Sequence, residues 1–463
     1  MPKNPLDRAA IVVIAILLFI IAAVIIRGDQ VGVQIISQVP RGDAVGVATR
    51  TQLAFTFSEP LPGSALDGRV MVSPGLTGTL RFNGSTAFFA PSRPFQPDTQ
   101  YTVTVLAGAR SERGRAMLRD ATWTFRTGHP RVVYLSPATA TGDLYLRDIG
   151  QAALPQRITS EPYGVFDFAI SPDGKRIVYS ATRDSSGSRD LWSIAPNGSN
   201  RERIQACDEQ VCQTPSFSAD STRVAFERRN LVKGAIGKSP GPARIWLYDF
   251  TSKTAASLSS DSQELGNMPR WAPVGEKLSY YDPVNSAVTV IDVSSGDRVQ
   301  LPSVLGDSGT WSPSGNGLIY PELRAVDAGQ FNQLLRADLV SAIITPVMPL
   351  STTNDASVAW SPVGSLIAFS RQRISSSGAT GGFMGFGPQV WVSTPDGAEA
   401  HALTDDPGYT YGGLAWSPDG EWIVAVRNDL QMPNPKPEVW LVRSNGSQVA
   451  RLAEDATLPA WLP

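Results

Sequence analysis

Histidine and cysteine are scarce in this chain of 463 residues, which has two of each. A structural zinc site needs about four such ligands, so the sequence predicts no metal site. The two histidines, His129 and His401, lie far apart and outside any motif that would make one a general base. We therefore predict no catalytic residue and no cofactor.

An excess of positive charge is also missing, because 40 Lys and Arg residues face 42 Asp and Glu residues. This balance does not favour the basic surface by which proteins bind nucleic acids. No long stretch after residue 30 has apolar residues at the spacing of an amphipathic helix. Glycine (41) and proline (36) are abundant instead, between short alternating segments, and this profile predicts an all-β protein.

One long apolar run is present near the N-terminus. Residues 9–26, AAIVVIAILLFIIAAVII, carry no charge, and as a helix they would span about 27 Å, close to one hydrocarbon core. A cleaved signal peptide is the alternative, but its apolar region is usually shorter and ends at a small-x-small site. We predict an uncleaved signal-anchor, with residues 1–8 in the cytoplasm on a slight positive bias, a stalk over 27–35, and the following domains outside the cytoplasm.

Cys207 and Cys212 lie in the segment ACDEQVC with a C-x4-C spacing. In an extracytoplasmic compartment a disulfide can close such a short loop. We predict this disulfide, with two free structural thiols as the alternative.

Residues 36–127 contain short alternating strands, among them QLAFTFS (52–58), YTVTVLAG (101–108) and ATWTFRT (121–127), separated by turn sequences. This spacing predicts an antiparallel β-sandwich. The FSEP segment, Pro97 before TQYTVTV, and the final TWTFRTG resemble the bacterial Ig-like domain of the SbsA type. The resemblance implies a spacer or adhesive module without catalysis.

From residue 131 onward the chain is repetitive. LAWSPDGEWIVAVRND (414–429), followed by EVWLVRSNGSQVARL (438–452), returns as FAISPDGKRIVYSATRD and as VAWSPVGSLIAFSRQ. Each unit offers four strands, A to D along the chain, which is the pattern of a β-propeller blade. The W-S-P-D-G signature resembles the TolB-type, WD40-like propeller repeat.

The repeats begin and end out of phase. The A-strand position recurs at Ile170, Phe217, Trp271, Trp311, Trp360, Trp416 and Trp461. Strands B to D first occur at 131–159, before any A strand, whereas the last A strand, LPAWLP (458–463), has none after it. We predict a seven-bladed propeller over 131–463 in which the C-terminal strand completes the first blade, since closure removes exposed sheet edges. Six blades and a separate hairpin are the alternative.

The connections between strands are uneven. The A–B and C–D turns are short, whereas the B–C connections at 228–244, 371–389 and 428–438 and the D–A connections at 206–213 and 404–413 are long. Long loops on a rigid scaffold commonly carry function. The candidate partner-binding residues there are Phe383, Met384, Phe386, Tyr409, Tyr411, Arg229, Lys233 and Lys238. The alternative is that these aromatic side chains pack back onto the blades.

The sequence therefore predicts a single-pass, membrane-anchored extracytoplasmic binding or scaffold protein. Through the long-loop face of the propeller it would recognise a protein or a surface polymer such as a polysaccharide. One alternative is a propeller hydrolase or lyase acting on envelope or extracellular carbohydrate, for which Asp405 and Asp406 are candidate carboxylates. Another is an envelope sensor, for which eight cytoplasmic residues offer little signalling capacity.

Overall fold

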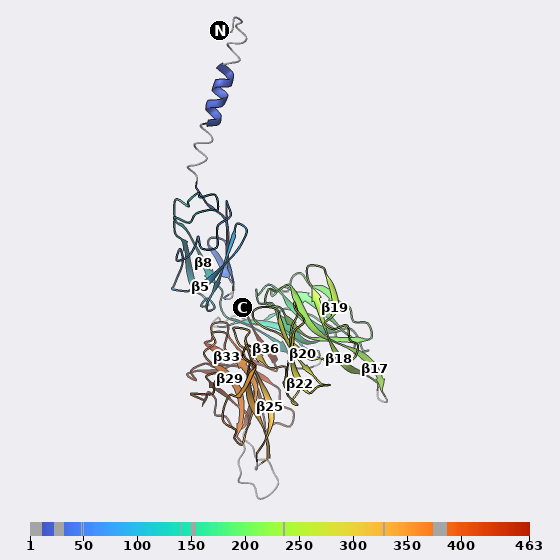
Figure 1. The fold of residues 1–463 in the computed structure, drawn as a ribbon. Helices are drawn as coiled ribbons and strands as arrows, with labels where there is room; N and C mark the ends of the chain where they lie inside the picture. The colour runs from blue at the N-terminus through green and yellow to red at the C-terminus, as the bar shows by residue number, and fades with distance from the viewer. Residues whose placement is uncertain are drawn as a thin grey trace. The chain divides into compact units, whose positions relative to one another are not determined.

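The computed structural model describes residues 12–22, 32–47, 49, 51–139, 141–149, 154–234, 237–326, 329–373 and 387–463 (Figure 1). The chain divides near residue 128 into two compact units.

Residues 12–22 form an exposed helix. In the described part of the chain, no helix has both the length and the apolar character needed to cross a membrane. Residues 9–11 and 23–26 of the predicted anchor lie outside the described residues. The anchor therefore stays a prediction.

The first unit is a sandwich of two four-stranded sheets. One sheet has the order β1 (Ile35–Val39), β3 (Leu53–Phe57), β6 (Thr86–Pro91) and β5 (Gly78–Asn83), and the other β2 (Ala44–Val47), β8 (Ala121–Thr127), β7 (Gln100–Val105) and β4 (Val70–Ser73). Alternate residues of β3 and β8 point inward, so Phe55, Trp123 and Phe125 meet in the core. The predicted β-sandwich is confirmed.

The first unit begins earlier than predicted. Val33 is 2% exposed and belongs to the core, and its N–H donates to the carbonyl of Ala116 at 3.1 Å. Residues 33–35 are therefore part of the domain and not of a stalk. Sequence reasoning missed this because one buried valine ahead of the first strand has no periodic pattern.

The second unit consists of four-stranded sets. The first three sets are β36 (Thr457–Leu462), β9 (Arg131–Ser136), β10 (Asp143–Asp148) and β11 (Gln156–Arg157); β12 (Val165–Ile170), β13 (Ile177–Thr182), β14 (Arg189–Ile194) and β15 (Glu202–Gln205); and β16 (Gln210–Phe217), β17 (Arg223–Gly234), β18 (Gly237–Asp249) and β19 (Thr254–Ser257). One parallel bridge between β14 and β16 joins the second and third sets into a single sheet.

Four further sets follow in chain order. They are β20 (Asn267–Trp271), β21 (Lys277–Asp282), β22 (Ala287–Asp292) and β23 (Arg298–Pro302); β24 (Thr310–Trp311), β25 (Gly317–Val326), β26 (Gly329–Asp338) and β27 (Ile343–Pro346); β28 (Thr353–Trp360), β29 (Ile367–Arg373), β30 (Gln389–Ser393) and β31 (His401–Ala402); and β32 (Tyr409–Trp416), β33 (Trp422–Asp429), β34 (Glu438–Arg443) and β35 (Val449–Glu454).

The C-terminal strand β36 pairs with β9, the first strand of the second unit. Trp461 lies opposite Val132, and the Ser136 hydroxyl donates to the carbonyl of Asp455, 319 residues away in the chain. The prediction that LPAWLP completes the set begun at residue 131 is confirmed.

Buried side chains join each set to the next. Among the described residues, successive core clusters link neighbouring sets in chain order. A further cluster contains Val132 and Tyr134 of β9 together with Val424 of β33 and Leu441 of β34. The set completed by β36 therefore packs against both the second and the last set of the series.

The repeated sequence signature encodes two local devices. In the Ser-Pro-Asp-Gly turn, the Ser171 hydroxyl donates to Asp173 at 2.6 Å, and Ser417 does the same with Asp419. Three inner-strand tryptophans form hydrogen bonds to the inner strand of the preceding set. The indole N–H groups of Trp311, Trp416 and Trp461 donate to the carbonyls of Arg270, Ala359 and Ala415, respectively. The first contact closes the turns at Ser171 and Ser417, and the second joins the inner strands of neighbouring sets.

Candidate functional site

Two hairpins extend from the ends of the sets that carry the B–C connections. The first is β17 and β18, where a loop is predicted over 228–244; that prediction is wrong, because Arg229 pairs with Ala243 and the ladder continues to Gly234 and Gly237 (Figure 1). In the described residues β18 pairs with β19 only from Trp246 onward. Pro240 therefore lies on an edge of the ladder, where the N–H group that proline lacks is not needed to bind a neighbouring strand. Glycine and proline in the sequence had favoured a loop.

The second hairpin, β25 and β26, is paired from Gly317 opposite Asp338 to Val326 opposite Gly329. Sequence reasoning missed it. The available signal was the run of strand-compatible residues on both sides of Asp-Ala-Gly at 327–329, which is a turn sequence.

We call residues 228–244 of β17 and β18 the cationic ribbon. It contains Arg228, Arg229, Lys233, Lys238 and Arg244 and no acidic residue. The register places Arg228 opposite Arg244 and Lys233 opposite Lys238. Like charges directly opposite each other destabilise a β-ladder, so the ribbon keeps its charge at a cost in stability.

The arginines of the ribbon are bound within the protein. Arg229 pairs with the buried carboxylate of Glu227 at 2.7 Å. Arg244 donates to the carbonyl of Asp261 at 2.7 Å. The guanidinium of Arg228 lies 4.4 Å from the ring centroid of Trp246, and burial lowers the pKa of Arg228.

The lysines have fewer contacts. Lys238 forms an ion pair with Glu209, with Nζ and Oε1 3.0 Å apart, and both side chains are exposed. Lys233 is exposed and forms no ion pair within the described residues. The exposed cations of the ribbon are therefore the two lysines, whereas its three arginines are partly buried.

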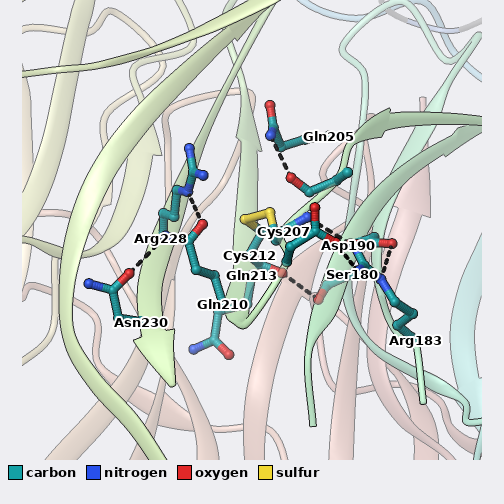
Figure 2. The surroundings of a disulfide bond; sticks show 12 residues. Ser180, Arg183, Asp190, Gln205, Cys207, Gln210, Cys212, Gln213, Arg228 and Asn230 are labelled. Carbon is teal, nitrogen blue, oxygen red and sulfur yellow. Dashed lines mark hydrogen bonds and ion pairs between the residues drawn. A yellow bond between two sulfur atoms is a disulfide. The ribbon is translucent and has the colours of Figure 1, made fainter. Parts of the chain in front are cut away.

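The predicted disulfide between Cys207 and Cys212 is confirmed, and both residues are fully buried. Figure 2 shows that the loop it closes reaches the base of the ribbon through Gln210, which accepts from Arg228 and donates to Asn230. The carbonyl of Glu209 accepts the N–H of Leu231 at 2.9 Å. The disulfide thus holds a loop that braces the ribbon.

The predicted aromatic cluster is only partly described. Phe383, Met384 and Phe386 lie outside the described residues. The Tyr409 ring lies 3.7 Å from the guanidinium of Arg427 and is partly exposed.

Tyr411 is 3% exposed and packs in a core cluster, and burial raises its pKa. Its ring is therefore not available to a partner in this structure. Of the candidate carboxylates, Asp406 forms an ion pair with Arg427 at 3.1 Å.

Asp167 is a half-buried carboxylate that sequence reasoning missed. Its Oδ2 accepts the N–H of Thr214 from the neighbouring inner strand at 2.6 Å, while its Oδ1 is inaccessible and without a hydrogen bond among the described residues. Burial raises the pKa of Asp167 to about 7, although Arg189 and the Thr214 N–H oppose the shift. The available signal was an aspartate within the apolar A strand VFDFAI.

Asp167 makes stability depend on pH. The folded chain holds this proton up to about pH 7, whereas an ordinary aspartate loses it near pH 3.8. The free energy of unfolding should therefore fall between pH 4 and 7, on the order of 4 kcal/mol for a pKa about three units above the ordinary value. Asp167→Asn should remove this contribution to the fall, measured by urea unfolding at pH 5 and pH 7.

Asp292→Asn is the matched control. Hydrogen bonds from Ser294 and Ser295 lower the pKa of Asp292, so its contribution to pH dependence lies below pH 4. An unchanged slope between pH 5 and 7 in Asp167→Asn would contradict the assignment.

Residues 29–127 match the family model of the bacterial Ig-like domain. The first unit is a bacterial Ig-like domain. The match begins within the predicted stalk, in agreement with the buried Val33.

Solved structures similar to this chain include TolB from Acinetobacter baumannii, with 15% identity, 87% of this chain and 86% of that chain covered, and a TM-score of 0.42. Another is the oligogalacturonate lyase from Vibrio parahaemolyticus, with 13% identity, coverages of 67% and 85%, and a TM-score of 0.51. A third is the β-propeller domain of the Trilobed protease from Pyrococcus furiosus, with 8% identity, coverages of 77% and 92%, and a TM-score of 0.45. Of these three, the lyase has a TM-score above 0.5, and at this identity the likeness shows a shared fold alone.

Proposed function

We propose that this chain is a membrane-anchored extracytoplasmic binding protein. Its second unit is a seven-bladed propeller that recognises a protein or a surface polymer through the face bearing the B–C connections. The blade count is supported by the repeated core clusters and by the cluster that joins β9 to β33. The location is supported by the apolar run of residues 9–26 and by the buried disulfide, which suits an oxidising compartment.

The contrast between the two faces carries the proposal. On one face the turns are short and closed by their own side chains, as at Ser171 and Asp173. On the other face two hairpins extend the sheets, and one of them has lysines facing each other across the ladder. Extensions from a rigid scaffold are typical sites of binding, and the unfavourable charge pair of β17 and β18 has no structural purpose within the described residues.

Shortening the cationic ribbon should weaken binding. In the test variant an Asn-Gly turn replaces residues 231–240, and in the control Glu202→Ala and Lys253→Ala remove an exposed ion pair from the opposite face. Saturable co-sedimentation with isolated cell envelopes should weaken at least fivefold for the ribbon variant and stay unchanged for the control. Equal binding by both variants and the natural chain would refute the choice of face.

A further inference from the structure

We propose that the tip of the cationic ribbon binds phosphate groups of a linear phosphodiester polymer, with Lys233 and Lys238 as the contacting side chains. This inference rests on the proposed binding function and names the chemical class of the partner. The net charge of −2 describes the whole chain, whereas the ribbon is a local exception with five cations and no carboxylate in residues 228–244.

The charge arrangement points to an anionic partner. Lys233 and Lys238 lie opposite each other in a part of the hairpin that pairs with no third strand among the described residues. Cross-strand neighbours have Cβ atoms roughly 5 Å apart, so the two ammonium groups can reach one anionic group or two adjacent ones. An anion between them turns a repulsive pair into an attractive one.

The available donors favour phosphate over carboxylate. A planar carboxylate is best matched by the two-pronged guanidinium of arginine. The guanidinium groups of Arg229 and Arg244 are held by Glu227 and by main-chain carbonyls. Arg228 is partly buried, lies against the Trp246 ring and donates to Gln210. The ammonium groups that remain act as compact point charges, which suit the tetrahedral, multiply accepting phosphate.

The surroundings favour a narrow chain over a membrane surface. Asp208 and Glu209 lie in the loop that braces the ribbon, and their side chains are 81% and 82% exposed. A flat anionic bilayer that reached the ribbon would also approach these carboxylates and be repelled. A single polymer strand can contact the two lysines and stay clear of both acids.

Glu209 competes with the proposed ligand. Its carboxylate holds Lys238 at 3.0 Å, and a phosphate group must displace it. Glu209→Gln should therefore increase affinity, whereas loss of the lysine charges should decrease it. A merely structural role for this ion pair would not produce opposite effects from its two partners.

The experiment uses the full-length chain in a neutral detergent and fluorescently labelled poly(glycerol phosphate) at low salt. We expect the double variant Lys233→Gln, Lys238→Gln to weaken binding about tenfold. The slope of the logarithm of the affinity against the logarithm of the salt concentration should fall by about two. Glu209→Gln should tighten binding about threefold.

Two control variants lie on the opposite face. Lys175→Gln with Lys253→Gln removes two exposed cations, and Glu202→Gln breaks the comparable ion pair with Lys253. Both should leave the affinity within twofold of the natural chain. Thermal unfolding identifies any variant that fails to fold, and Glu209→Gln then still tests the proposal.

Two further probes identify the source of the anion. A polyuronate of equal charge should bind at least tenfold more weakly, and phosphatidylglycerol vesicles should not bind. Equal binding of the polyuronate, preferential binding of the vesicles, or weaker binding by Glu209→Gln would overturn the inference. If the ribbon-shortened variant loses envelope binding while poly(glycerol phosphate) does not bind at all, the inference fails and the proposed function stands.

Discussion

A chain that ends at Asp455 is expected to lose the cooperative folding of its second unit. The deletion removes β36, the inner strand that pairs with β9, and exposes the cluster around Val132 and Tyr134. It also breaks the link to the last set, because Trp461 donates its indole N–H to the carbonyl of Ala415 at 3.1 Å. Thermal unfolding followed by circular dichroism should show no cooperative transition for this unit, or the protein should be recovered only as aggregates.

A point substitution tests the same closure more gently. Trp461 is 7% exposed, and Trp461→Ala should lower the free energy of unfolding by about 3–5 kcal/mol in urea, since it leaves a large cavity between two sets. A chain ending at Leu462 is the control and should unfold like the natural protein. If the chain ending at Asp455 also melted like the natural protein, closure through β36 would be disproved.

The second large effect concerns the disulfide between Cys207 and Cys212. Replacing both residues with alanine should lower the free energy of unfolding by about 2 kcal/mol, the loop-closure contribution expected for so short a loop. Replacing both with serine should cost about 1–2 kcal/mol more, because the sites are fully buried and the hydroxyls must find new partners. Urea unfolding with and without reductant measures both effects.

Comparing the double alanine variant with the natural chain separates the effect of the covalent S–S bond from that of side-chain packing. Reductant should destabilise the natural chain and leave the alanine variant unchanged. The disulfide-closed loop also positions Glu209 and Gln210 against the ribbon. The alanine variant should therefore bind envelopes more weakly than the natural chain even under conditions in which both are fully folded. If the alanine variant were as stable as the natural chain, the stabilising effect of the disulfide would be disproved, and if it bound envelopes equally well, the bracing role would be disproved.

Much of the fold could be predicted from local patterns. The alternation in LAFTF and ATWTFRT places every second side chain in the sandwich core, and the structure agrees. The Ser-Pro-Asp-Gly turns recur because each is closed by its own serine and aspartate, a contact that needs no distant partner. The C-x4-C spacing likewise predicts a bond between close neighbours.

The candidate site was less predictable. Lys233 and Lys238 are predicted partner-binding residues, but their direct opposition depends on how far β17 and β18 pair, and glycine and proline suggested a loop there. Tyr411 looks exposed in the sequence because it follows a turn, yet it packs between two sets. Asp167 gained its raised pKa from burial beside a neighbouring strand, which no local pattern encodes.

The sequence by itself determined the all-β class, the Ig-like domain, the repeats, the disulfide and the strand with which the chain closes. Most of these follow from contacts within a few residues. The closing strand follows from the repeats, because the last A strand has no strands B to D after it and the first strands B to D have no A strand before them. The tertiary structure decided which polar groups are buried, which arginines are already paired and which lysines stay accessible. These properties depend on side chains that distant strands bring together, because accessibility and pKa are set by all neighbours in space and not by neighbours in the chain.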